Sequence, residues 1–217
     1  MALPDDLQLH RRLPARDPHH PGDPRGQLGH RGAAGLNGTL FGELEGPTRD
    51  EAGEPGGAAR PSTGFLIRTD GAARGNPGPA SAGAALYDLD RPDARDPRAR
   101  PDASISDYLG VQTNNVAEYT GVVRALELAR ELGAGEVHLL LDSKLIVEQL
   151  AGRWRVKDAK LIPLWSAARG TLGGFRRWTA AHVPRAQNSV ADALANEAID
   201  RAHAGGPASV VRRPASR

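Results

Sequence analysis

The chain has 217 residues, of which 4% are aromatic, with 26 Gly and 17 Pro, so we expect one ordinary domain beside a segment that packs no core. The absence of cysteine excludes disulfides and thiolate metal sites. No apolar run is long enough to span a membrane, so we expect a cytoplasmic protein with no membrane partner. The net charge of +2 divides into −2 over residues 1–62 and +4 over residues 63–217, which weakly favours a polyanionic partner.

Residues 1–62 form the first segment. They are rich in Pro, Gly, Arg, His and Asp, Phe41 is their only aromatic residue, and no helical or alternating period persists. We therefore expect a disordered or loosely folded N-terminal extension. Its histidines, such as His19 and His20, are expected to be solvated rather than to bind a metal.

A folded domain is predicted from residue 63 to residue 203. Its expected elements alternate in the order β-β-β-α-β-α-α-β-α, which predicts an α/β fold with a five-stranded mixed sheet flanked by helices. The first three strands would be antiparallel and the later ones parallel. The strands are predicted at residues 65–69, 81–89, 105–110, 136–141 and 175–183, and the helices at 115–132, 143–150, within 156–172 and at 189–202. Residues 204–217 are expected to be a disordered basic tail.

Four acids stand where one predicted element passes to the next: Asp70, Glu118, Asp142 and Asp192. Singly, each has an ordinary explanation. Asp70 precedes Gly as in a turn, Asp142 ends a strand, and Glu118 and Asp192 match capping-box spacing. Gathered at the strand ends, the same acids would form a site for hard divalent cations, because nothing else offsets so much packed negative charge.

Four blocks of residues around these acids occur in order. Together they resemble type 1 ribonuclease H, in a bacterial or archaeal form without the long basic protrusion of some members. The resemblance covers about residues 64–202 and implies the ribonuclease H-like fold. The blocks are Thr69–Pro79, Thr113–Tyr119, Leu141–Lys144 and His182–Ala195.

The resemblance implies that the four acids are catalytic and hold two Mg²⁺ or Mn²⁺ ions. Asp70 would bridge both ions, and Asp142 and Asp192 would serve the ion that activates water. Glu118 would serve the other ion and contact a ribose 2′-hydroxyl. His182 matches the family's mobile histidine and would assist proton transfer or product release.

The implied activity is endonucleolytic hydrolysis of the RNA strand of RNA–DNA hybrids, leaving 5′-phosphate and 3′-hydroxyl ends, by a monomer. Recognition of RNA would depend on its 2′-hydroxyls. Trp154 is expected to pack on a DNA sugar, with core packing as the alternative. The residues expected to bind substrate are Gly71, Ala72, Ala73, Asn76, Thr113, Asn114, Asn115, Trp154 and Asn188.

Two alternatives stay open at this point. One is another nuclease of the same acidic-cluster fold, such as a junction resolvase or an exonuclease, although the Gly75–Gly78 loop and the Thr113–Asn115 segment argue against it. The other is a non-catalytic hybrid-binding protein, which would gain nothing from four mutually repelling acids.

Overall fold

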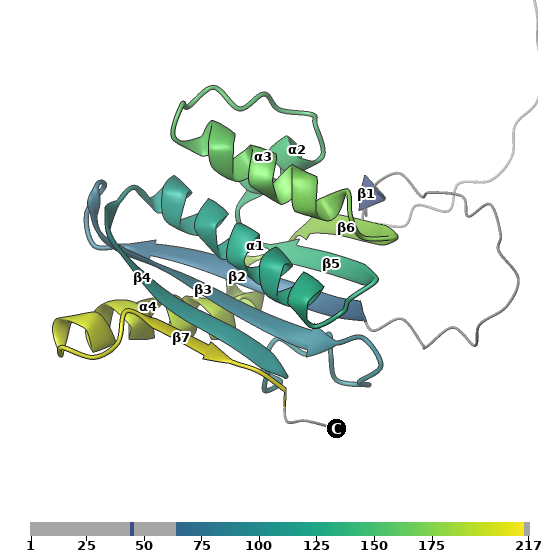
Figure 1. Cartoon of the computed structure of the whole chain (residues 1–217), viewed down its shortest axis with the longest axis horizontal. Helices are drawn as coiled ribbons and strands as arrows, with labels where there is room; N and C mark the ends of the chain where they lie inside the picture. The colour runs from purple at the N-terminus through teal and green to yellow at the C-terminus, as the bar shows by residue number, and fades with distance from the viewer. Residues whose placement is uncertain (1–43, 46–63, 215–217) are drawn as a thin grey trace, which may run out of the picture. The chain divides into compact units, whose positions relative to one another are not determined.

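The computed structural model describes residues 44–45 and 64–214 (Figure 1). These residues belong to the compact unit Leu40–Arg217, whereas the unit Met1–Thr39 lies outside the described residues. The predicted extension over residues 1–62 is likewise outside them, apart from the two residues of one short strand. Among the described helices, none is long and apolar enough to cross a membrane.

One mixed sheet organises the described chain, with its strands in the order β1-β6-β5-β2-β3-β4-β7. Adjacent strands are antiparallel from β2 through β3 and β4 to β7, and β1 is antiparallel to β6. The β2–β5 and β5–β6 pairs are parallel. The five predicted strands are confirmed as β2 to β6, and one short strand is added at each edge. The bounds are β1 Leu44–Glu45, β2 Gly64–Ala73, β3 Gly78–Asp88, β4 Ala103–Gln112, β5 Glu136–Leu141, β6 Arg177–His182 and β7 Ser209–Arg212.

Helices cover both faces of this sheet. Three of them lie on one face and α4 lies on the other (Figure 1). This explains why Phe65, Leu66 and Ile67 in the central strand β2 are all buried, as expected for a strand covered on two sides. The helices are α1 Asn114–Glu131, α2 Lys144–Leu150, α3 Leu161–Leu172 and α4 Ser189–His203, with a short 3₁₀ turn, η1, at Arg185–Gln187.

The sheet brings two of the predicted acids side by side. Thr69 of β2 pairs with Leu141 at the end of the parallel strand β5. Asp70 follows Thr69 in β2, and Asp142 directly follows the last residue of β5. The two carboxylates therefore lie at the same edge of the sheet. The N-terminal ends of α1 and α4 carry the other two acids.

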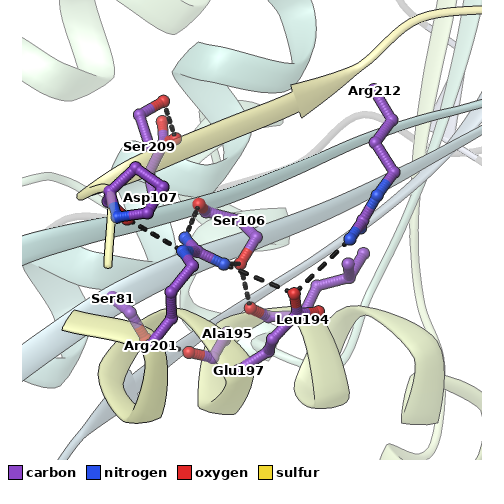
Figure 2. A network of polar contacts seen from close by, with 10 residues as sticks. Ser81, Ser106, Asp107, Leu194, Ala195, Glu197, Arg201, Ser209 and Arg212 are labelled. Carbon is purple, nitrogen blue, oxygen red and sulfur yellow. Dashed lines mark hydrogen bonds and ion pairs between the residues drawn. The ribbon is translucent and has the colours of Figure 1, made fainter. Parts of the chain in front are cut away.

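The prediction of a disordered tail over residues 204–217 is wrong for its central part, because residues 209–212 form strand β7 on the edge of β4. Figure 2 shows what holds this strand. Arg201 donates to the Ser106 carbonyl at 2.5 Å, to the Ser106 hydroxyl at 2.9 Å and to the Pro207 carbonyl at 2.8 Å. The Ser209 hydroxyl donates to Asp107 at 2.5 Å. Four extended residues after a glycine pair are too short a signal to predict from sequence.

Arg201→Met is expected to destabilise the protein by about 2–4 kcal/mol, because it removes the three hydrogen bonds above and a fourth to Glu197 at 3.4 Å, all made by a charged donor that is only 15% exposed. Urea unfolding followed by circular dichroism measures the loss. Arg212→Met is the control, since that side chain is 56% exposed and lies 3.5 Å from Glu197, a pair worth less than about 1 kcal/mol. Equal losses in the two variants would contradict this account of β7.

Candidate active site

Asp70 is the most deeply placed of the four acids. It is 4% exposed, and its Oδ1 accepts the backbone N–H of Gly71 at 2.8 Å. The pKa of Asp70 is raised to about 8, chiefly by burial and then by the carboxylates of Asp142 and Asp192, although Arg185 and the Gly71 N–H lower it. Three acids from β2, the β5–α2 corner and α4 therefore act on one another.

Glu118 joins this group from the first turns of α1. Burial raises its pKa, as does the charge of Asp142, while hydrogen bonds from Ser143 and Asn114 lower it. The Asn114 side chain donates to Glu118 Oε1 at 2.8 Å. All four predicted acids thus meet at one edge of the sheet, each from a different element.

Asn188 is fully buried between two of these elements. Its Nδ2 donates to the Thr69 carbonyl at 2.8 Å and to Asp142 Oδ1 at 2.9 Å, while its Oδ1 has no partner. The prediction that Asn188 binds substrate does not fit this structure, because its side chain is fully enclosed. Its contacts instead fix the orientation of Asp142 relative to β2.

Arg185 is the charged residue of this site that sequence reasoning missed. Its guanidinium donates to Asp192 Oδ1 at 2.5 Å, and its charge lowers the pKa of both Asp70 and Glu118. The side chain is 75% exposed. By contrast, His182 ends β6 with an exposed side chain, and no hydrogen bond or ion pair joins it to the four acids in the described chain. The only sequence signal for Arg185 was its position as a single cationic residue in the loop before Asp192.

The acids suit a hard divalent cation by their chemistry, since carboxylate oxygens are the ligands such ions prefer. The raised pKa of Asp70 also fits, because a cation would offset both causes of the shift, the burial of the carboxylate and the charges of Asp142 and Asp192. Within residues 64–214, however, no three His, Cys, Asp or Glu side chains form a group that could hold a metal ion as they stand.

Three of the residues predicted to bind substrate, Asn76, Thr113 and Asn114, lie together at the start of α1. Asn76 Oδ1 accepts the backbone N–H of Asn114 at 3.1 Å, which ties the loop after β2 to the start of α1. Thr113 caps that helix through the Val116 N–H at 3.4 Å. Of the residues predicted to bind substrate, those that are partly or fully exposed are Ala72, Ala73, Asn76, Thr113, Asn114, Asn115 and Trp154.

Trp154 lies apart from the acids, on the segment between α2 and α3. It is 47% exposed, so it does not pack in the core, and with Arg153, Arg155 and Trp165 it lines a hollow of about 490 Å³. The connecting segment, residues 151–160, contains no helix. The expected absence of a long basic protrusion is therefore confirmed.

Comparisons with known proteins agree with this geometry. A family described as reverse transcriptase-like matches residues 68–198. A bifunctional protein of Mycobacterium tuberculosis is 44% identical over 137 residues, which are 63% of this chain and 36% of that protein. The chain thus spans about a third of the length of that relative. A ribonuclease H of Thiobacillus denitrificans is 34% identical over 149 residues, covering 62% of this chain and 93% of the relative.

A solved structure is similar over the same region. It is LC11-RNase H1 crystallised in complex with an RNA/DNA hybrid, with 37% identity and a TM-score of 0.57, covering 64% of this chain and 99% of that one. The family model, these relatives and this structure match the same part of the chain. The chain therefore belongs to the type 1 ribonuclease H family.

Proposed function

We propose that the protein is an endonuclease that hydrolyses the RNA strand of RNA–DNA hybrids. The observation that carries this proposal is the meeting of Asp70, Glu118, Asp142 and Asp192 from four elements, where burial and the neighbouring carboxylates together raise the pKa of Asp70 to about 8. A purely binding protein has no use for such a cluster. The related LC11-RNase H1, which was crystallised with a hybrid, supports the same substrate class.

The four acids would hold two divalent cations, Mg²⁺ or Mn²⁺, with Asp70 shared between them. When bound, such ions supply Lewis acidity that activates water and neutralises the leaving oxygen, which gives 5′-phosphate and 3′-hydroxyl products. The chain's own polar groups prepare this site. Asn188 orients Asp142, and Asn114 orients Glu118. Arg185 holds Asp192 and would exchange that contact for a phosphate oxygen when substrate arrives.

The RNA strand would lie against the start of α1 and the loop after β2. Asn76, Asn114 and Asn115 are partly or fully exposed there and offer amide groups to 2′-hydroxyls. Trp154 would pack on a sugar of the DNA strand, with Arg153 and Arg155 near its phosphates. His182 stays a candidate for proton transfer, because its side chain is exposed to solvent at the end of β6.

The two rival functions have less support. A junction resolvase or an exonuclease has no need for an amide-rich surface suited to 2′-hydroxyls beside the acids. A non-catalytic hybrid-binding protein would be more stable with fewer buried carboxylates. We further propose that the protein acts as a monomer in the cytoplasm during replication and repair, in keeping with its lack of cysteine.

A substrate panel tests the proposal. Labelled RNA–DNA hybrid, double-stranded RNA, double-stranded DNA and a four-way junction are each incubated with the protein and Mg²⁺ or Mn²⁺. We expect internal cuts in the RNA of the hybrid, 5′-phosphate ends, and no cleavage after chelation by EDTA. Cleavage of DNA, or binding of the hybrid without cleavage under either metal, would refute the assignment.

A further inference from the structure

A buried arginine lies next to the acids without being one of their partners. Arg68 precedes Asp70 by two residues on β2, so both side chains leave the same face of the strand. Arg68 is 1% exposed, and burial lowers its pKa. The hydrogen bonds of its guanidinium go to two backbone carbonyls rather than to a carboxylate. A buried cation held in this way is costly, which points to a specific role.

The guanidinium joins two segments that are far apart in sequence. Nη1 donates to the Gln187 carbonyl at 2.7 Å, in the loop that enters α4. Nη2 donates to the Arg95 carbonyl at 3.2 Å, in the loop between β3 and β4. Nε has no partner. One side chain therefore fastens both loops to the central strand, immediately beside Asp70.

The contact between Arg68 and the Gln187 carbonyl acts on the active site through the next residue, Asn188. The Gln187 carbonyl belongs to the peptide bond that leads into Asn188, whose side chain holds the Thr69 carbonyl and Asp142. The Asn188 N–H in turn donates to the Arg185 carbonyl at 2.8 Å, which closes the turn that carries Arg185. Arg68 and Thr69, two successive residues of β2, are thus both hydrogen-bonded to the turn over residues 185–188.

We propose that Arg68 is a positioning residue: through the Gln187 carbonyl it fixes the turn that presents Asn188 to Asp142 and Arg185 to Asp192. Its effect on turnover depends on the proposed hybrid cleavage, whereas its hold on the turn does not. The hybrid-facing residues at the start of α1 lie on other elements. Loss of Arg68 therefore acts on the chemical step rather than on hybrid affinity.

Arg68→Met tests this proposal in two ways. Hydrogen exchange followed by mass spectrometry reports on residues 183–190 without any substrate, and we expect exchange there to quicken about tenfold or more. Hybrid cleavage should show kcat reduced about tenfold with KM within about twofold of wild type. Arg68→Lys, which reaches one carbonyl at a time, should recover part of both effects. It also replaces Arg68→Met in the comparison if that variant does not fold.

Tyr87→Phe is the matched control. Tyr87 is buried on the neighbouring strand β3, and its hydroxyl has no partner, so its removal should leave both exchange and kcat unchanged. Unaltered exchange in a folded Arg68→Met protein would overturn the proposed hold on the turn. Faster exchange with unchanged kcat, or a KM that rises as much as kcat falls, would overturn its positioning role. A wild-type protein that cuts no hybrid would refute the proposed function alone.

Discussion

Asp70→Asn is expected to reduce hybrid cleavage about 1000-fold or more while hybrid binding stays within about threefold. The substitution keeps the shape of a side chain that is 4% exposed, and it removes the charge that the other acids surround. The chain then lacks the shared ligand proposed for both cations. Single-turnover cleavage of labelled hybrid measures the first quantity, and fluorescence anisotropy in Ca²⁺ measures the second.

Asp93→Asn is the control for this variant, since Asp93 is an exposed carboxylate in the loop between β3 and β4 and pairs with Arg91. It makes the same change of charge away from the site and should retain full activity. If Asp70→Asn kept more than about a tenth of wild-type activity, Asp70 would not be a shared ligand, and the assignment of the four acids would fail.

Asp70→Asn also allows loss of function to be separated from loss of folding. Without metal, the pKa of Asp70 is about 8 in the folded protein, against 3.8 as its ordinary value. Between these pH values the folded state keeps a proton that the unfolded chain has released, so stability falls as pH rises from about 4 to about 8. Asn cannot ionise. In EDTA at pH 8, Asp70→Asn should therefore be more stable than wild type by at least about 1 kcal/mol, as measured by urea unfolding, with little difference at pH 4.

The sheet and the positions of the acids were predictable because each rests on a local signal. The run Phe65–Ile67 predicts a strand buried on both faces, and the alternation in Glu136–Leu141 predicts its parallel neighbour. Once these two strands are parallel, Asp70 and Asp142 must leave the same edge of the sheet. Glu118 and Asp192, near the starts of α1 and α4, lie at the same edge.

The partners of those acids were not predictable, because they depend on contacts between distant segments. Arg68 looks like an ordinary strand residue until the loops that hold Arg95 and Gln187 close over it. Asn188 looks like a polar loop residue available to substrate, yet α4 and β2 enclose it. Burial of a polar side chain follows from how elements pack and leaves no local pattern in the sequence.

Gly71 illustrates how closely those packed elements approach one another. It directly follows Asp70 on β2 and faces helix α1. A Cβ at this position would lie 2.3 Å from the backbone nitrogen of Glu118 and 2.7 Å from the carbonyl carbon of Ala117. Real Cβ atoms do not approach backbone so closely, and a helix backbone cannot turn aside as a flexible side chain can. The absence of a side chain is what allows α1 to set Glu118 beside Asp70.

Gly71→Ala is therefore expected to push α1 away from β2 and to destabilise the protein by about 2–3 kcal/mol. The folded fraction should cleave hybrid about 100-fold more slowly, because Glu118 moves relative to Asp70. Urea unfolding and single-turnover cleavage measure the two losses. Gly170→Ala is the matched control: Gly170 lies in α3 with open space where its Cβ would be, so Ala should stabilise that helix by about 0.5–1 kcal/mol and leave cleavage unchanged. If Gly71→Ala behaved like this control, close contact between β2 and α1 would not be what places Glu118 in the site.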